Sequence, residues 1–456
     1  MATVNPRIPN LQDIPTPFGV PLSAIYKQSF AYITVKDRLP IILTKVIDTF
    51  CRNKNQIIDT YGQGAEEDIK HIIGFISQLK NEIVTNKTLK LLRLNNQVVT
   101  NDAKEWNKYL EYRTRVDGQV PTWFNTKWLY CECYMYRVLA QEIGLTSTIS
   151  NYDPFETQKR DVFINSLESM DAVASYLKNI IRSEEHDQEL NLKNDFLRLL
   201  KLTLWSNRQD LSISAGSPLS QIGNPLDALE SLNDNIIVND SECAWHIVSE
   251  RTGKNVENIH MVLDNAGYEL FTDMCLAAFL IRILPRAKIT FHPKVYPWYV
   301  SDTMVRDFHW TLEYMNILDR YPNVQTLAHI FQDYLTRQIW RIQEEPYWTG
   351  PYDFRQMKEK APLMYDQFSN AKLVIFKGDL NYRKLLGDIN FKYTTSFTAA
   401  LGDFHPTNIL SLRTVKSDIC VGLSLGAAES LLEKDKDWMI SGHYGIIQTA
   451  VHSHNT

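Results

Sequence analysis

The hydrophobic pattern of the chain changes its period near residue 235, and this change constrains the fold more than any other feature. From about Ala31 to Trp205, apolar residues recur every three or four positions, as they do on one face of an amphipathic helix. Beyond Asn235, short apolar runs end in polar residues or glycine, and each is followed by a helical stretch. The sequence therefore predicts a mainly helical first part and an alternating strand and helix second part. Two helical series are Ile69, Ile72, Ile73, Ile76, Leu79, Ile83 and Phe163, Leu167, Met170, Val173, Leu177, Ile180.

Three apolar runs in the second part predict strands. They are I-H-M-V-L-D-N-A-G at 259–267, A-K-I-T-F-H-P-K at 287–294 and K-L-V-I-F-K-G-D-L-N at 372–381. Continuous apolar runs are typical of central strands in a parallel sheet that is covered on both faces. Open sheets of this kind bind ligands outside the carboxyl ends of their strands. We therefore expect the chemistry of this protein at the ends of these three runs.

The boundary between the two parts is expected in a passage rich in Ser, Gly and Pro at 211–225. A chain of 456 residues is long enough for two or three domains. We predict a mainly helical domain at 1–225 and an α/β/α domain at 226–456, with 211–225 as a linker or an active-site loop.

Composition argues against several classes of protein. With 48 Lys and Arg against 53 Asp and Glu, the net charge is −5, and no basic run suits a nucleic-acid backbone. The longest apolar stretch, 274–284, is interrupted by Arg282 and is too short for a membrane span, which needs about 20 residues. The first residues lack a hydrophobic leader segment, so we expect a cytosolic protein, with entry into the nucleus left open. Six cysteines without a C-x-x-C pair predict reduced thiols.

The first two strand ends carry oxygen ligands. Asp264 and Asn265 follow the first run and precede a helix start at Gly267. A carboxylate and an amide oxygen suit a hard divalent cation, and the alternative is an Asx turn that ends the strand. Asp302 lies ten residues beyond His292. Taken alone, it favours the N-cap of the helix expected from Met304 onward.

The third strand end carries a denser polar cluster. A structural turn needs only a glycine and one polar residue, whereas three cations, an amide and a carboxylate suit a phosphate ester beside a metal. The chain has no Walker A loop, and no G-x-G-x-x-G follows a strand, so nucleoside triphosphates and dinucleotides are disfavoured. The members of this cluster are Lys377, Asp379, Asn381, Arg383 and Lys384.

Taken together, these motifs resemble the damage-control phosphatase family. The R-T-x-K signature points to its third subfamily, to which a protein-glutamate (acidic residue) O-methyltransferase activity is also ascribed. The similarity covers nearly the whole chain. The matching segments are L-D-N-A-G-Y-E-L at 263–270, W-Y-V-S-D at 298–302, F-K-G-D-L-N-Y-R-K-L-L-G-D at 376–388, R-T-V-K at 413–416, and blocks at 115–137 and 204–212.

The resemblance implies a fold, a cofactor and a reaction. The fold is a helical N-terminal domain packed on a Rossmann-like α/β/α sandwich with a mostly parallel sheet. The cofactor is Mn²⁺ or Ni²⁺, with Co²⁺ or Mg²⁺ as alternatives. The reaction is the hydrolysis of small sugar phosphates such as fructose 1-phosphate or fructose 6-phosphate. Protein partners stay open.

The resemblance also implies site residues. The metal ligands are Asp264, Asn265 and Asp302, and the catalytic carboxylates are Asp264, Asp302 and Asp379. Glu269, on the helix after Asp264, is expected either to face the same pocket or to lie in solvent. The implied substrate contacts, with Glu269 added from its position, are Asp264, Asn265, Glu269, Asp379, Leu380, Asn381, Tyr382, Arg383 and Lys416.

Two other functions stay open at this stage. In the methyltransferase alternative, S-adenosylmethionine occupies the same pocket, although the chain lacks the glycine-rich loop of the commonest methyltransferase fold. In the second alternative, the protein is a non-catalytic scaffold, which an intact set of metal and phosphate residues disfavours. Within the phosphatase hypothesis, the nucleophile is either a metal-activated water or a carboxylate.

Overall fold

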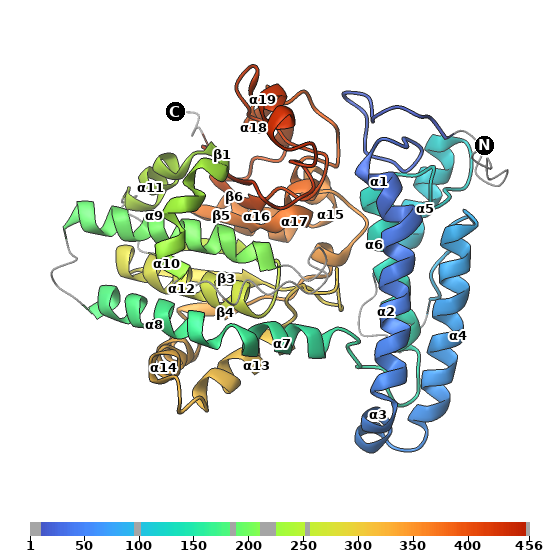
Figure 1. The fold of residues 1–456 in the computed structure, drawn as a ribbon, viewed down its shortest axis with the longest axis horizontal. Helices are drawn as coiled ribbons and strands as arrows, with labels where there is room; N and C mark the ends of the chain where they lie inside the picture. Colours follow the sequence, from blue (N-terminus) through green and yellow to red (C-terminus); the bar gives the residue numbers. More distant parts are fainter. Residues whose placement is uncertain (1–10, 95–101, 183–187, 210–224, 251–255, 453–456) are drawn as a thin grey trace. The chain divides into compact units, whose positions relative to one another are not determined.

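The computed structural model describes residues 11–94, 102–182, 188–209, 225–250 and 256–452 (Figure 1). The chain divides into two compact units. The first contains Met1–Glu156, Pro346–Asp353 and Gly387–Phe391, and the second contains Thr157–Glu345, Phe354–Leu386 and Lys392–Thr456. The helices at 157–205, which the sequence grouped with the N-terminal half, thus belong to the same unit as the sheet. Apart from Pro225, the passage 211–225 lies outside the described residues, so a boundary there stays a prediction.

The first unit is helical, as its periodicity predicts. In α4 the residues of the predicted series are buried, except for Ile73, which is half-buried. Helix α2 packs against α4. Each fully buried Ile or Leu side chain of α4 stabilises the fold by about 1.5–3 kcal/mol. The helices of this unit are α1 (Phe30–Ile33), α2 (Leu39–Arg52), α3 (Lys54–Tyr61), α4 (Ala65–Val84), α5 (Ala103–Asp117) and α6 (Trp128–Gly144), with a π-helical turn at Thr34–Arg38.

The second unit contains a seven-stranded sheet of order β1-β7-β6-β5-β2-β3-β4. All neighbouring strands are parallel except β6 and β7, which are antiparallel. The three predicted runs form β2, β3 and β5, so the expectation of a mostly parallel sheet is confirmed. The strands are β1 (Ile236–Asn239), β2 (Glu257–Val262), β3 (Ala287–His292), β4 (Trp340–Ile342), β5 (Leu373–Lys377), β6 (Ile409–Thr414) and β7 (Gly445–Ala450).

Helices cover both faces of this sheet, which explains why the central strand β5 is apolar from Leu373 to Phe376. In β5, Ile375 points into the core that includes residues of α8, α9 and α12. The next residue, Phe376, points the other way and packs against Phe354, Phe368 and Phe404. Successive side chains of a strand point to opposite faces, so a strand buried on both faces needs an apolar residue at every position.

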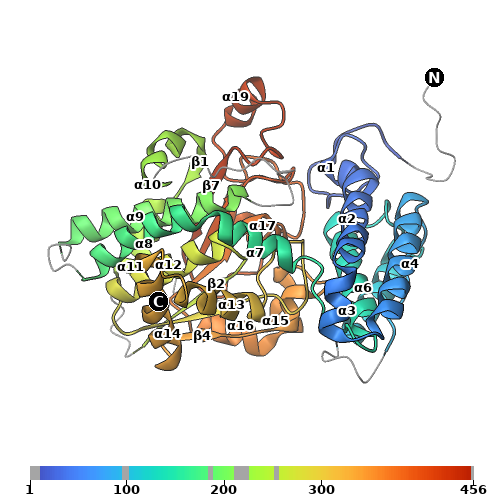
Figure 2. The same cartoon turned by 60° about the horizontal axis from the view of Figure 1, so that its bottom comes forward.

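The helices of the second unit follow the predicted alternation with strands. On one face, α12 contacts both α8 and α9 (Figures 1 and 2). The predicted series from Phe163 to Ile180 is interrupted after Asn165 and continues in α8. The helices are α7 (Glu156–Asn165), α8 (Leu167–Arg182), α9 (Glu189–Trp205), α10 (Pro225–Ala228), α11 (Ser241–Ser249), α12 (Tyr268–Ile283), α13 (Val305–Asn316), α14 (Pro322–Thr336), α15 (Met357–Lys360), α16 (Pro362–Ser369), α17 (Gly378–Leu385), α18 (Phe397–Leu401) and α19 (Ala427–Lys434).

Helix α12 contains most of the apolar stretch 274–284 and buries it inside the second unit. Its residues from Tyr268 to Leu280 are all buried. Among the described residues, no helix combines the length and the hydropathy that crossing a membrane requires. The stretch thus serves the protein core, and the polar residues near the start of α12 lie at the end of the sheet where β2 ends.

The direction in which successive strands are added to the sheet reverses beside β2. From β2 the chain adds β3 and then β4 on one side, and it returns to add β5 on the other side of β2. At such a topological switch point the connections after the two central strands diverge to opposite faces and leave room for a ligand. The predicted clusters at the ends of β2 and β5 both lie at this switch point.

Candidate functional site

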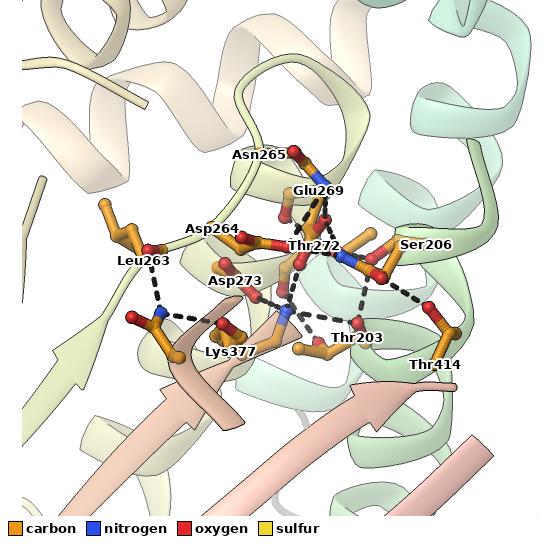
Figure 3. Close-up of polar contacts among 12 residues, drawn as sticks. Thr203, Ser206, Leu263, Asp264, Asn265, Glu269, Thr272, Asp273, Lys377 and Thr414 are labelled. Carbon is orange, nitrogen blue, oxygen red and sulfur yellow. Dashed lines mark hydrogen bonds and ion pairs between the residues drawn. The ribbon is translucent and has the colours of Figure 1, made fainter. Parts of the chain in front are cut away.

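The site is a network of buried polar side chains at the carboxyl ends of β2, β5 and β6 (Figure 3). Asp264 follows β2, Lys377 ends β5 and Thr414 ends β6. The remaining members come from α12, from the loop after β2, and from the end of α9 with the 3₁₀ turn that follows it. Segments that are more than 200 residues apart in the chain are thereby hydrogen-bonded to one another.

Asp264 is held against the backbone of Gly378. A Cβ atom at Gly378 would lie 1.8 Å from Oδ2 of Asp264 and 2.8 Å from Oδ1, and the glycine has a φ of +81°. Only glycine adopts this backbone conformation without strain and leaves room for the carboxylate. The glycine in K-G-D therefore allows Asp264, which follows β2, to pack directly against the residue after β5. Asp264 is only 5% exposed.

Asn265 and Asp302 meet through their backbones. They form an antiparallel β-bridge, and the N–H of Thr303 donates to the carbonyl of Asp264 at 2.7 Å. Asn265 Oδ1 accepts a hydrogen bond from the Ser301 hydroxyl at 2.6 Å. All three predicted metal ligands are therefore brought to one backbone junction.

The alternative role of Asp302 as a helix cap is wrong. Helix α13 begins at Val305 and its N-cap position is Met304. The Asp302 carboxylate is instead paired with the ammonium of Lys294 at 3.1 Å, and Lys294 also donates to the carbonyl of Leu263 at 2.7 Å. Sequence reasoning missed Lys294, although it is the last residue of the predicted run at 287–294 and lies only two residues after His292, where β3 ends.

Glu269 belongs to the site, and its alternative position in solvent is wrong. It is 2% exposed. Its Oε2 accepts from the amides of Asn207 and Asn265 at 2.7 and 2.8 Å, and its Oε1 accepts from Lys377 at 2.8 Å. Glu269 therefore connects the expected metal ligand Asn265 to a buried cation.

That cation, Lys377, is completely buried between two carboxylates. Its ammonium lies 2.7 Å from Asp273 Oδ1 and 2.8 Å from Glu269 Oε1. Burial alone opposes its charge, but the two carboxylates outweigh this and hold the pKa of Lys377 above its ordinary value. Burial raises the pKa of the Asp273 carboxyl to about 7. The pattern did point to Lys377, whereas Asp273 carried no signal because it lies within an apolar helix.

Asp379 lies beside the end of β6. Its Oδ1 accepts from Arg413 Nε at 2.7 Å, from Ser417 Oγ at 3.1 Å and from the backbone N–H of Lys416 at 3.2 Å. The Asp379 side chain keeps 16% of its surface exposed, more than Arg413, which is fully buried. The R-T-V-K segment therefore forms the partner of D-L-N-Y-R.

Several predicted substrate contacts have structural partners. The Asn381 amide donates to the carbonyls of Lys377 at 2.7 Å and of Leu263 at 3.2 Å, so it joins the ends of β5 and β2. Tyr382 is fully buried, hydrogen-bonded to Gln448 at 2.9 Å and covered by the Arg413 guanidinium at 4.2 Å from its ring centroid. The other two predicted contacts of this helix, Leu380 and Arg383, are also buried. Their roles toward a substrate stay predictions.

Asn207 is a further member of the network that sequence reasoning missed. It lies in a 3₁₀ turn after α9 and is 2% exposed. Its amide donates to Asp264 and Glu269, and its own oxygens accept from the Thr414 hydroxyl and from Lys416 Nζ. The only signal was its place in the W-S-N-R-Q-D block, which has no chemical signature of its own.

The donor set fits a hard divalent metal ion. Within the described ranges, no three His, Cys, Asp or Glu side chains are grouped as a metal site. The predicted set of Asp264, Asn265 and Asp302 differs from such a group because it has two carboxylates and one amide oxygen. These are the ligands that Mg²⁺ and Mn²⁺ accept. Asn265 and Asp302 are paired in a β-bridge, and Asp264, which precedes Asn265, lies against Gly378.

Comparison of the sequence with known proteins matches it to one family. The model of the family described as "Damage-control phosphatase ARMT1-like domain" matches residues 34–431. The chain is 41% identical over 436 residues to "Damage-control phosphatase ARMT1" of Xenopus tropicalis, covering 94% of this chain and 98% of that protein. The protein of the same name from Homo sapiens is 38% identical over 431 residues, covering 92% and 96%. A solved structure of a DUF89 family protein from Pyrococcus horikoshii aligns with a TM-score of 0.38 and 19% identity, covering 73% of this chain and 87% of that one.

Proposed function

The chain belongs to the damage-control phosphatase ARMT1-like family, and from this premise we propose that it is a divalent-metal-dependent hydrolase of small sugar phosphates in the cytosol. Family membership supports the coarser statement, that the protein is a phosphatase of metabolite repair. The metal, and substrates such as fructose 1-phosphate or fructose 6-phosphate, are the proposal. Mn²⁺ or Ni²⁺ is the expected ion, with Co²⁺ or Mg²⁺ as alternatives.

One observation carries the proposal. The predicted metal ligand Asp264 and the predicted phosphate contact Lys416 are both hydrogen-bonded to Asn207, at 2.7 and 2.6 Å. Asp379 accepts from the backbone of Lys416 in the same cluster. The carboxylate expected to bind the metal and the cation expected to bind the phosphate group therefore belong to one hydrogen-bonded network at the carboxyl ends of the strands, which supports the proposal.

The residues divide the work of phosphate hydrolysis. Asp264, Asn265 and Asp302 would hold the ion, which when bound supplies Lewis acidity and an activated water. Lys416 brings a positive charge that stabilises the phosphoryl oxygens as negative charge builds on them. Asp379, oriented by Arg413 and partly exposed, is placed to accept hydrogen bonds from sugar hydroxyls.

The test is a phosphate-release screen on metal-stripped protein. Fructose 1-phosphate, fructose 6-phosphate and other sugar phosphates are each assayed alone and with Mn²⁺, Ni²⁺, Co²⁺ or Mg²⁺. We expect release that depends on added metal and that Asp302→Asn abolishes. The exposed Asp319→Asn, which removes the same charge away from the site, is the matched control and should keep wild-type activity.

A parallel arm addresses the methyltransferase alternative. The same preparation is incubated with methyl-labelled S-adenosylmethionine and proteins rich in glutamate. Methyl transfer without phosphate release under any metal condition would reject the phosphatase proposal. Absence of both activities would favour the scaffold alternative.

A further inference from the structure

One buried residue of the site, Asn207, has no role in the proposed function. Asn207 lies in the turn Ser206–Gln209, which is fixed to α12. The Thr272 hydroxyl donates to Ser206 Oγ at 2.9 Å, and the Thr203 hydroxyl donates to the Thr272 carbonyl at 3.2 Å. Because α9 also packs against β6 and β7, the turn is anchored on two sides.

The contacts of the Asn207 side chain can be made only by an amide. Its Nδ2 donates both hydrogens to carboxylates, Asp264 Oδ2 and Glu269 Oε2, each at 2.7 Å. Its Oδ1 accepts from the hydroxyl of Thr414. Two carboxylate partners on one end and a hydroxyl partner on the other determine which end is nitrogen. An aspartate here would face two carboxylates without a proton to donate, serine has only one donor, and alanine has none.

The backbone of the same residue holds the phosphate-binding cation. The Asn207 carbonyl accepts from Lys416 Nζ at 2.6 Å, and Lys416 is 6% exposed. One residue therefore contacts Asp264 through its side chain and Lys416 through its backbone. Asp264 follows β2 and Lys416 follows β6, so the 3₁₀ turn that contains Asn207 is a third element that links the two.

We propose that Asn207 is a positioning residue that aligns the Asp264 carboxylate with the Lys416 ammonium across the ends of β2 and β6. The inference rests on the proposed metal-dependent phosphatase function and adds a residue to it. The side chain restrains rotation of Asp264, which lies against Gly378 on another side. The backbone carbonyl keeps Lys416 at a fixed place relative to that carboxylate.

The two contacts predict separable effects. A substitution of the Asn207 side chain removes the donor to Asp264 but leaves the backbone carbonyl that holds Lys416. Outer partners of metal ligands typically contribute about 10- to 100-fold to metal affinity or activity. We therefore expect Asn207→Ala to weaken metal binding, whereas KM for the sugar phosphate at saturating metal should change little.

The experiment measures Mn²⁺ affinity directly on metal-stripped, full-length protein by isothermal titration calorimetry. Asn207→Ala should raise the Mn²⁺ dissociation constant by about 10- to 100-fold. Thr414→Val, which removes only the hydroxyl that orients the amide, should raise it less. The matched control is Asn408→Ala, which removes an amide bonded to the Lys372 carbonyl and the His452 N–H at the opposite end of β6, and it should keep the wild-type constant.

Each outcome decides the proposal. Wild-type Mn²⁺ affinity in folded Asn207→Ala would overturn it, and so would an equal loss in Asn408→Ala, because that would indicate general destabilisation. If Asn207→Ala does not fold, Thr414→Val decides, and wild-type affinity there would also overturn the proposal. A wild-type protein that binds Mn²⁺ but releases no phosphate would reject the proposed function while the Mn²⁺ affinities still decide the role of Asn207. A wild-type protein that binds no Mn²⁺ would overturn the alignment role.

Discussion

Substituting Gly378 by alanine would force the backbone and the Asp264 carboxylate apart. The new Cβ would lie 1.8 Å from Oδ2, whereas an ordinary contact is at least 3.4 Å, so the two groups must separate by about 1.6 Å. A misplacement of about 1 Å at a reacting centre costs on the order of 10²-fold in rate. We therefore expect Gly378→Ala to lower kcat/KM by about 10²-fold or more.

The substitution should also destabilise the fold through two separable causes. Alanine at a φ of +81° costs about 1–2 kcal/mol by itself. Displacement of a buried carboxylate from its hydrogen bonds adds about 1.5–3 kcal/mol. The free energy of unfolding should therefore fall by roughly 2.5–5 kcal/mol, the sum of these two costs.

A second glycine isolates the conformational cost. Gly426 has a φ of +82°, and a Cβ atom there would meet nothing within 4 Å. Gly426→Ala should lose only about 1–2 kcal/mol and keep wild-type activity. Urea unfolding and phosphate release are measured on both variants. Equal destabilisation of the two variants, with wild-type activity in Gly378→Ala, would refute the close contact with Asp264.

Three further substitutions test the ligand set, the phosphate contact and the buried histidines. Asp264→Ala should abolish stimulation by divalent metal and lower metal content with the fold intact, and normal metal content would remove Asp264 from the ligand set. Lys416→Met should lower kcat/KM for sugar-phosphate hydrolysis by about 10²-fold, the scale of one positioned electrostatic group, and a wild-type rate would contradict the role assigned through R-T-V-K. Burial lowers the pKa of His260 to about 4, and that of its neighbour His292 also lies well below the ordinary value of 6.5. Between pH 6.5 and about 4, the unfolded chain binds more protons than the folded chain. The free energy of unfolding should therefore be highest above pH 6.5 with respect to these groups, and it should fall as the pH drops from 6.5 toward 4. His260→Phe should flatten this dependence in urea titrations, and an unchanged slope would assign it to other groups.

The sequence by itself determined the type and the burial of the main elements. The run that became β5 is apolar from Leu373 to Phe376 because both faces of the sheet are covered there, whereas β2 and β3 mix apolar and polar residues and are still mostly buried. The apolar positions of these runs can be recognised from the sequence alone. The same holds for the buried face of α4. Strand ends also carry the polar residues of the site, so Asp264 and Asp379 are predictable from the point at which an apolar run stops.

Only the tertiary structure decided which elements meet. An amphipathic series shows that one face of α8 or α9 is buried, but it does not say against what, and both helices join the unit that contains the sheet. The strand order that brings β5 beside β2 and β6 beside β5 depends on long-range pairing, which no local pattern encodes.

Asn207 shows the same limit at the level of one side chain. Its chemistry arises from partners on three other elements, Asp264, Glu269 and Thr414, which lie 57 to 207 residues away along the chain. A single asparagine after a helix has no periodicity, so its sequence neighbours contain no information on these partners. The residue types of the site were therefore set by the sequence, whereas their alignment exists only in the folded chain.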